Sequence, residues 1–289
     1  MARDKRNKGG LRSGVAAARS SLVNTRQIPW GTIAAVVAIV ALAAVVFGYY
    51  LVESAPQRAQ EQREEEAAEQ FTPTADNPNP ALDIEGIVSE SYEPGLHVQP
   101  PQRVDYDHSP PIGGPHDAAW AACNGVVYDE PVRSEAMVHS LEHGAVWIAY
   151  NPEEVDGNEL QHLEVRADGE PFTMMSPYPG LDTPISLQSW GHQLKVEDAE
   201  DERIDQFIVA LRRNQNTYPE TRGSCDALGP PEFDPDNPPP FDPSPPGDDA
   251  VPMDAGQEDL LPEDAMGELP DYDEEELPTD GEGDAGDDE

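Results

Sequence analysis

An uncharged apolar run near the N-terminus constrains the architecture of this chain more than any other feature. Residues 30–52, WGTIAAVVAIVALAAVVFGYYLV, contain no charged side chain. A helix of about 20 apolar residues is long enough to cross a hydrocarbon core of about 30 Å. Trp30 stands at one end, and Tyr49 and Tyr50 at the other, where amphipathic aromatic rings favour the membrane interface. The run therefore predicts a transmembrane helix, with the lipid bilayer as its partner.

The charges on either side of this run predict its orientation. Residues 1–29 contain seven Lys and Arg but only one acidic residue, and Glu53 follows the run directly. The positive-inside rule then places the N-terminus in the cytoplasm and everything after Val52 outside the cell membrane. A cleaved signal peptide is the competing interpretation, but its apolar core is usually only about 7–15 residues long. We therefore favour an uncleaved signal anchor and a single-pass membrane protein.

Charge and proline divide the rest of the chain. The sequence has 17 Lys and Arg against 58 Asp and Glu, a net charge of −41. This excess excludes the basic surface that binds a phosphate backbone, so we expect no nucleic-acid partner. The predicted parts are a disordered basic tail (1–29), the transmembrane helix (30–52), a polar stalk or linker (53–96), one folded extracytoplasmic domain (97–226), and a disordered Pro-rich acidic tail (227–289). The acidic tail serves solubility or, alternatively, captures a cation or an envelope protein.

Hydrophobic patterns within the domain predict its elements. They are a strand over 126–128, a helix with Ser134 as N-cap and Gly144 just past its end, a buried strand over 145–150, a helix over 153–166, a strand over 171–178, a strand over 184–197 bent near Gly191, and a helix over 201–214. This order predicts a two-layer α/β (α+β) domain with a mixed sheet. A thioredoxin-like core has the same order, but the sequence contains no C-x-x-C motif, so redox chemistry of that kind is not implied.

The two cysteines of the chain, Cys123 and Cys225, flank most of this domain. Outside the membrane, two cysteines in a domain without others are expected to pair. A loop of about 100 residues closed in this way stabilises a protein by about 4–5 kcal/mol in the chain-entropy model. The alternative is two free thiols too far apart to bridge.

A cluster of histidines provides the candidate site. His139, Glu142 and His143 share one face of the predicted helix, and His108 and His116 lie on a Pro/Gly-rich loop shortly before it. Imidazole nitrogens bind Zn, Cu, Ni or Fe, so these five residues predict a site for zinc or another transition metal, or for a small ligand. The competing interpretation is that they are buried polar groups bonded to one another and to the loop backbone.

The spacing of the central motif also bears on catalysis. H-x-x-E-H is the spacing of inverzincin metalloproteases, in which both histidines bind zinc and the glutamate is the general base. Glu142 would be that base here. However, the chain is small for such an enzyme, the predicted helix ends directly after His143, and no third ligand has supporting sequence context. We therefore favour a site without catalysis.

Three sequence blocks carry a resemblance to a known family. They are HSPPIGGPHDAAWAACNGVVYDEPV, VHSLEHGAVWIAYNP and MMSPYPGLDTPISLQSWGHQL. Over residues 95–226 the chain resembles the domain-of-unknown-function (DUF) family 3105 of bacterial, often actinobacterial, single-pass membrane proteins. The H-S-L-E-H-G block is the most specific part. The resemblance places the positions shared by the family at His108, His116, Cys123, His139, Glu142, His143 and Gly144.

Two departures from the family pattern leave the central motif intact. The usual Thr-Ser-Gly-Pro-His of the loop is Ile112-Gly113-Gly114-Pro115-His116 here, and His192 replaces the basic residue after Trp-Gly. The resemblance implies no activity. Three hypotheses follow: a membrane-anchored domain that binds a metal or small ligand, a metal-dependent hydrolase with Glu142 as base, and a structural or scaffolding protein of the envelope.

Overall fold

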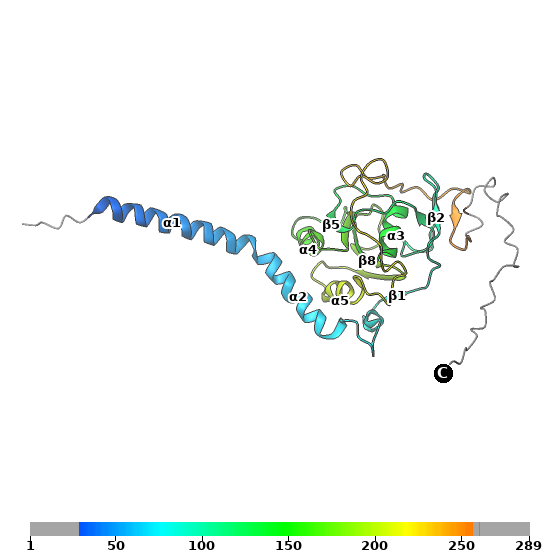
Figure 1. The fold of residues 1–289 in the computed structure, drawn as a ribbon, viewed down its shortest axis with the longest axis horizontal. Helices are drawn as coiled ribbons and strands as arrows, with labels where there is room; N and C mark the ends of the chain where they lie inside the picture. Colours follow the sequence, from blue (N-terminus) through cyan, green and yellow to red (C-terminus); the bar gives the residue numbers. More distant parts are fainter. Residues whose placement is uncertain (1–28, 257–259, 261–289) are drawn as a thin grey trace, which may run out of the picture. The chain divides into compact units, whose positions relative to one another are not determined.

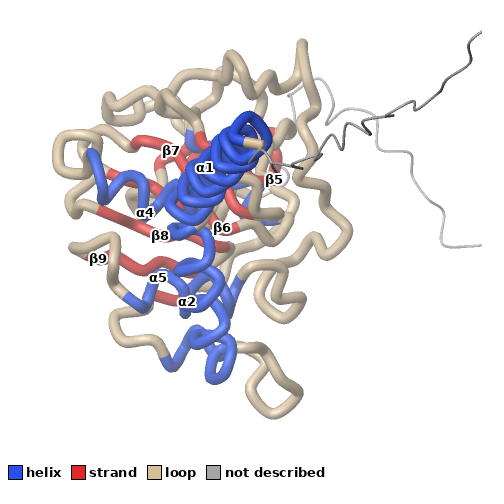
Figure 2. Tube along the Cα trace, turned by 90° about the vertical axis from the view of Figure 1, so that its left-hand side faces the viewer, coloured by secondary structure: helices blue, strands red, loops and turns tan. Residues whose placement is uncertain are grey.

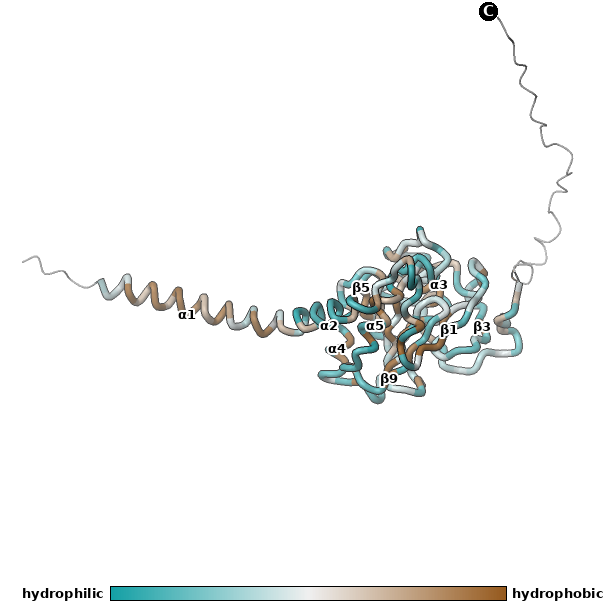
Figure 3. The backbone as a smooth tube through the Cα atoms, turned by 90° about the horizontal axis from the view of Figure 1, so that it is seen from below, coloured by the Kyte–Doolittle hydropathy of each residue, from teal (hydrophilic) through white to brown (hydrophobic). Residues whose placement is uncertain are grey.

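The computed structural model describes residues 29–256 and Leu260, which fall into two compact units divided after Glu53 (Figure 1). Helix α1 (Trp30–Glu53) belongs to the first unit and is mainly brown in the hydropathy colouring of Figure 3. Its length and composition make it a candidate membrane span, although a signal sequence near the N-terminus passes the same test. The predicted basic tail lies almost wholly outside the described residues.

The second unit is built on a mixed six-stranded sheet with the strand order β1-β9-β8-β6-β7-β5. Central β6 runs parallel to β7 and antiparallel to β8, so the predicted mixed α+β class is confirmed. The strands of the sheet are β1 (Val88–Ser89), β5 (Asn124–Val127), β6 (Val146–Tyr150), β7 (Thr173–Pro177), β8 (Ile185–Ser189) and β9 (His192–Val196). Two small pairs complete the strands: β2 (His97–Val98) with β4 (His116–Asp117), and β3 (Val104–Asp105) with β10 (Val251–Pro252).

Side chains cover both faces of this sheet. Neighbouring residues of a strand point to opposite faces, and Trp147 and Ile148 are both fully buried, in two separate clusters. Helices α4 (Gly157–Ala167) and α5 (Glu202–Leu211) pack on the Ile148 side, whereas α3 (Ser134–Glu142) packs on the Trp147 side (Figure 1). Burial on both faces explains why this strand is a continuous apolar run in the sequence.

The segment 184–197 forms two strands, where we predicted one bent strand. Strands β8 and β9 pair antiparallel down to Ser189 opposite His192, so Trp190 and Gly191 form a two-residue turn. Gly191 has φ +68°, a left-handed conformation that glycine adopts without steric cost. A Cβ at this position would also lie 2.3 Å from the carbonyl oxygen of Glu90. The glycine that we interpreted as a bend is therefore a hairpin turn.

The ends of α3 determine where the histidine motif lies. Arg133 is the N-cap and Ser134 is the first helical residue, so the predicted serine cap was wrong by one position. Gly144 ends the helix as predicted: its φ is +89°, and its N–H donates to the carbonyl of Leu141 at 2.9 Å. This sharp end lets the chain enter β6 directly after the motif.

The region predicted as a polar stalk or linker, 53–96, is largely part of the folded unit. Helix α2 (Ala55–Phe71) packs against α4 and α5, and Figure 2 shows it beside α5. Gln60 is buried there, and its side chain donates to Asp205 at 2.7 Å. The short 3₁₀ helix η1 (Pro80–Asp83) follows. Because this contact face is polar, no apolar stripe in the sequence indicated it.

The described part of the predicted acidic tail, 227–256, contacts the domain through a few buried residues, while most of its residues are exposed or partly exposed. The Phe233 side chain is 1% exposed, and the ring of Phe241 lies 4.7 Å from that of Tyr178. Isolated aromatic residues thus anchor a proline-rich segment whose average composition predicted disorder. The remainder of the tail, apart from Leu260, lies outside the described residues.

Candidate metal centre

Two very short strands place the first pair of histidines. Strands β2 and β4 run parallel, and His97 lies directly opposite His116 in their register. Helix α3 packs on β4. It carries His139 and Glu142, which are three residues apart and therefore share a face. These elements bring four potential ligands together, although His97 and His116 lie on two separate strands, 19 positions apart in the sequence.

The four side chains form a compact and largely buried group. One nitrogen or oxygen atom of each of His97, His116, His139 and Glu142 lies within 4.8 Å of the corresponding atom of every other member. His116 and Glu142 are 0% exposed and His139 is 3% exposed, while His97 is partly buried. The ring centroids of His116 and His139 are 4.8 Å apart. By residue type and convergence, this group could hold a metal ion.

Backbone carbonyls fix the tautomer of two of the rings. Nδ1 of His116 lies 2.8 Å from the carbonyl oxygen of Gly114, and Nδ1 of His139 lies 2.6 Å from that of Asp117. A carbonyl oxygen only accepts hydrogen bonds, so each Nδ1 carries a hydrogen. In the neutral ring, Nε2 then holds the free lone pair. Metal-binding histidines usually have this arrangement, with the second ring nitrogen donating to a fixed acceptor.

The contact between His116 and Glu142 is close but does not have the geometry of a hydrogen bond. Nε2 of His116 lies 2.9 Å from Oε2 of Glu142, yet the two atoms are not aligned as a hydrogen bond. Nε2 of His97 is also buried without a hydrogen-bond partner. The lone pairs of a neutral imidazole and a carboxylate repel each other, so the contact is favourable only if a proton or a metal ion lies between them.

Further hydrogen bonds fix the second oxygen of Glu142 and the side chain of Asp117, the residue whose carbonyl accepts from His139. Oε1 of Glu142 accepts the backbone N–H of Gly95 at 2.7 Å. The carboxylate of Asp117 accepts two hydrogen bonds from Arg133, at 2.7 and 3.1 Å. Arg133 thereby fixes the residue whose carbonyl orients the ring of His139. Such outer contacts preorganise the ligands of a metal.

The surroundings shift the pKa values of three residues of the group, His97, His139 and Glu142. Burial, followed by the neighbouring His116 and His143, lowers the pKa of His139 to about 3. Burial and His116 also lower the pKa of His97. Burial opposes the ionisation of Glu142. A protonated His116 and the N–H of Gly95 together outweigh burial and bring the pKa of this carboxyl below its ordinary value. Neutral imidazoles and an ionised carboxylate are the metal-binding forms.

The structure brings together three of the five residues singled out from the sequence: His116, His139 and Glu142. His143 lies beside them, with its ring centroid 4.6 Å from that of His139, but its Nε2 faces Glu220. His108 lies apart from the group. Its Nε2 is 3.2 Å from Oε1 of Glu90, and it lines a surface cavity of about 440 Å³.

Sequence reasoning missed His97 and Glu220. His97 stands between two apolar residues, Leu96 and Val98, both 3% exposed or less, and this alternation was the only local signal of a strand. Glu220 follows the last helix in a segment with no pattern of its own. Only the tertiary contacts between loops place either residue near the motif.

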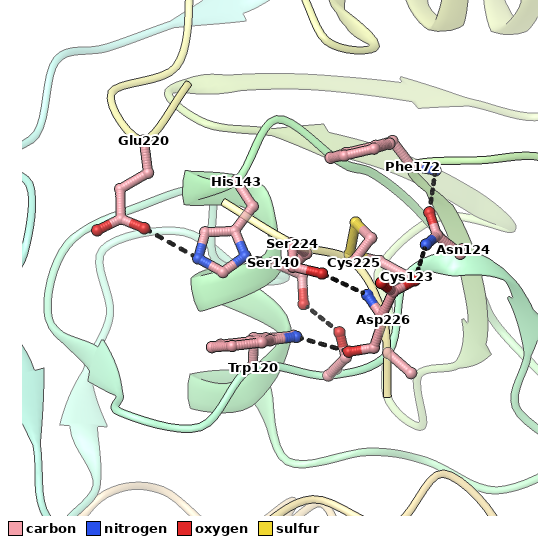
Figure 4. The surroundings of a disulfide bond; sticks show 12 residues. Trp120, Cys123, Asn124, Ser140, His143, Phe172, Glu220, Ser224, Cys225 and Asp226 are labelled. Carbon is pink, nitrogen blue, oxygen red and sulfur yellow. Dashed lines mark hydrogen bonds and ion pairs between the residues drawn. A yellow bond between two sulfur atoms is a disulfide. The ribbon is translucent and has the colours of Figure 1, made fainter. Parts of the chain in front are cut away.

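The disulfide predicted between Cys123 and Cys225 is confirmed, and it joins residues 102 positions apart (Figure 4). It holds the segment after α5 against α3. The backbone N–H of Cys123 donates to the carbonyl of Cys225 at 3.0 Å, and the indole of Trp120 donates to the carbonyl of Asp226 at 2.9 Å. Ser224, next to the bridge, presents its carbonyl to His143 (Figure 4).

The fold and the site define a disulfide-bonded α+β domain with a buried histidine–glutamate cluster, in a chain whose N-terminal helix is a candidate membrane span. Residues 97–227 match the model of the family described as "Protein of unknown function (DUF3105)", which confirms the resemblance over this part of the chain. No curated protein and no solved structure matches the chain.

Proposed function

We propose that this protein binds one transition-metal ion, with zinc as the favoured metal, through His97, His116, His139 and Glu142. The observation that carries the proposal is the 2.9 Å contact between Nε2 of His116 and Oε2 of Glu142, two buried acceptor atoms without an aligned hydrogen bond. A divalent cation would remove their repulsion. Three imidazole nitrogens and one carboxylate oxygen are suitable ligands for tetrahedral Zn²⁺.

The geometry favours retention of the metal over catalysis. Four protein ligands complete a tetrahedral ion, whereas catalytic zinc sites keep one position for water or substrate. Oε1 of Glu142 accepts the N–H of Gly95, and Oε2 faces the ring of His116. This carboxylate is therefore better placed as a ligand than as a general base. A hydrolase with Glu142 as base therefore has less support than a binding protein.

The proposal also places the domain outside the cell membrane, anchored by α1. The basic residues before α1 favour a cytoplasmic N-terminus. The disulfide supports the same side, because such bonds persist in oxidising compartments. The domain would then meet metal ions of the cell exterior or envelope.

Metal content per chain tests this proposal. We would purify the full chain in mild detergent without a polyhistidine tag, expose it to Zn²⁺, remove free metal, and measure bound metal by mass spectrometry. We expect about one ion per chain in the wild type, as for a closed four-ligand site, and far less in His116→Ala and Glu142→Gln. His162→Ala is the matched control, because His162 lies 3.8 Å from Glu200 on the surface and away from the cluster.

Circular dichroism would establish that the variants fold. A folded wild-type chain that retains no metal would contradict the proposal. The same holds if His116→Ala and Glu142→Gln retain as much metal as the wild type.

A further inference from the structure

A second imidazole–carboxylate pair lies beside the proposed site and is built in the same way. Nε2 of His143 lies 3.0 Å from Oε2 of Glu220, and Nδ1 of His143 lies 2.6 Å from the carbonyl oxygen of Ser224 (Figure 4). The carbonyl again requires a hydrogen on Nδ1, so the lone pair of the neutral ring points toward a carboxylate. The pair thus repeats the arrangement of His116 and Glu142.

His139 lies between the two pairs and belongs to both. Its ring centroid is 4.8 Å from that of His116 and 4.6 Å from that of His143. One ligand atom each of His139, His143 and Glu220 also lie within 4.8 Å of one another. Because Nδ1 of His139 is bound to the carbonyl of Asp117, only Nε2 is free to bind a metal. His139 therefore serves one ion in one position at a time.

The two pairs differ in their access to solvent. The side chain of Glu220 is 44% exposed, whereas His143 is 2% exposed and Glu142 is fully buried. The indole of Trp120 packs against the rings of His139 and His143, at 5.5 and 4.9 Å between centroids, and offers no ligand on that side. Glu220 is the most exposed member of the two groups, since His97 is only partly exposed and the others are buried, so it is the residue most accessible to a cation in solvent.

We infer that His143 and Glu220 form an outer site that captures the ion and passes it to the inner ligands through His139. This inference rests on the proposed function. The ion first replaces some of its water with the exposed carboxylate and the imidazole of His143, then binds Nε2 of His139, and finally exchanges the outer ligands for His97, His116 and Glu142. The shared ligand lets the ion move without complete release.

The segment that carries Glu220 is fixed for this role. The disulfide holds it at Cys225, and Gly223 packs directly on the outer imidazole, where an added Cβ would lie 2.3 Å from the ring of His143. The backbone N–H of Glu220 also donates to the carbonyl of Glu142 at 3.2 Å. The outer carboxylate is therefore attached through the backbone to the residue that supplies the inner one.

The rate of metal loading separates an outer site from a structural ion pair. We would mix metal-free full chain with Zn²⁺ in a stopped-flow instrument and follow the free ion with a zinc-responsive dye. Glu220→Gln should slow loading about tenfold or more, since a charged residue at the mouth of a site raises association rates by factors of this order. Dissociation should slow by the same factor, so that the equilibrium affinity changes less than about twofold, because an outer site lowers the barrier in both directions.

Two further variants control for charge. Glu197→Gln removes an exposed carboxylate elsewhere and should load at the wild-type rate, while Glu220→Asp keeps the charge and should recover much of the rate. Unchanged loading in Glu220→Gln would overturn the inference, as would a loss of affinity at an unchanged loading rate, which would make Glu220 a resident ligand. If the wild type binds no zinc, the proposed function fails instead, and that outcome is recognised before any variant is compared.

Discussion

At the scale of single residues, the site depends on groups that never touch the proposed ion. His139 has the correct tautomer because the carbonyl of Asp117 accepts its Nδ1–H, and Asp117 is held in turn by Arg133. The sequence indicates His139, since the H-x-x-E-H motif is local. It cannot indicate Arg133 as a supporting residue, because its contact with Asp117 depends on how β4 lies against the start of α3.

Removing this support should weaken metal binding without removing a ligand. We expect Arg133→Ala to lower zinc affinity about tenfold or more, which is the usual effect of losing an outer-sphere partner. Competition with a chelator of known affinity measures this change. Arg203→Ala is the control, because Arg203 pairs with Asp201 at the start of α5, on the other face of the sheet. Equal affinities of the two variants would contradict the supporting role of Arg133.

His192, a buried histidine outside the proposed metal site, should make stability depend on pH independently of the metal. Its Nδ1 donates to the carbonyl of Trp190 at 2.8 Å, and its Nε2 lies 3.0 Å from the side-chain amide of Asn79. Burial lowers the pKa of His192. The unfolded chain, whose histidines have a pKa of about 6.5, then binds the proton more readily than the folded one. The stabilisation is complete above about pH 6.5 and is lost as the pH falls below it.

Urea unfolding of metal-free protein at several pH values tests this expectation. The free energy of unfolding of the wild type should decrease between about pH 6.5 and 5 more steeply than that of His192→Gln, because the variant lacks the titrating group. Parallel profiles for the two proteins would show that His192 takes no part.

At the scale of elements, long patterned segments were predictable and short ones were not. Helix α3, strand β6 and helix α5 each bury a regular set of apolar residues. The sequence placed α3 and β6 within one position, whereas α5 ends three positions before its predicted end. Strands β2 and β4 have two residues each, too few to show any periodicity. Their register, which sets His97 opposite His116, is a property of the folded chain. Half of the proposed ligand set therefore comes from elements that the sequence does not reveal.

A buried ionic network connects α2, α4 and α5. Arg166 is 0% exposed and makes two hydrogen bonds of 2.9 Å to the carboxylate of Asp205, which also accepts from Gln60. Asp205→Ala should destabilise the protein by about 3–5 kcal/mol, since it leaves the guanidinium buried without a counter-charge. Glu202→Ala on the exposed face of α5 should cost about 0.5 kcal/mol or less. Equilibrium denaturation measures both values, and similar losses would refute the account of the network.

At the scale of the whole molecule, orientation across the membrane is the property that the function needs most. The sequence predicts it from charge, and the structure contributes a candidate span and a disulfide. Binding of a cation or an envelope protein by the acidic tail stays a prediction. The first part of the tail is held on the domain by Phe233 and Phe241, although most residues of that part are exposed or partly exposed.

Thiol labelling in intact cells tests the orientation. We would introduce one cysteine before α1, Ser13→Cys, and one in the distal tail, Gly283→Cys; the two native cysteines are paired and do not react. A membrane-impermeant maleimide should label Gly283→Cys in intact cells and Ser13→Cys only after lysis. The reverse pattern would place the domain in the cytoplasm. Absence of the N-terminal segment from the mature chain would instead indicate a cleaved signal peptide.

The order of the two ligand sets along the chain has a consequence for biogenesis. His97, His116, His139 and Glu142 all precede Glu220 and Cys225. With the N-terminus held in the cytoplasm, the chain would be exported in order from the end of α1 onward. The complete inner set would then emerge while the outer carboxylate and the second cysteine were still inside the translocation machinery. On the proposed route, a newly made protein takes up its ion before the disulfide forms. A mature protein that has lost its ion has to bind a new one through the outer site of His143 and Glu220. Substitution of Glu220 would therefore leave the first uptake of metal unchanged and slow only the rebinding of metal by a mature protein that has lost it.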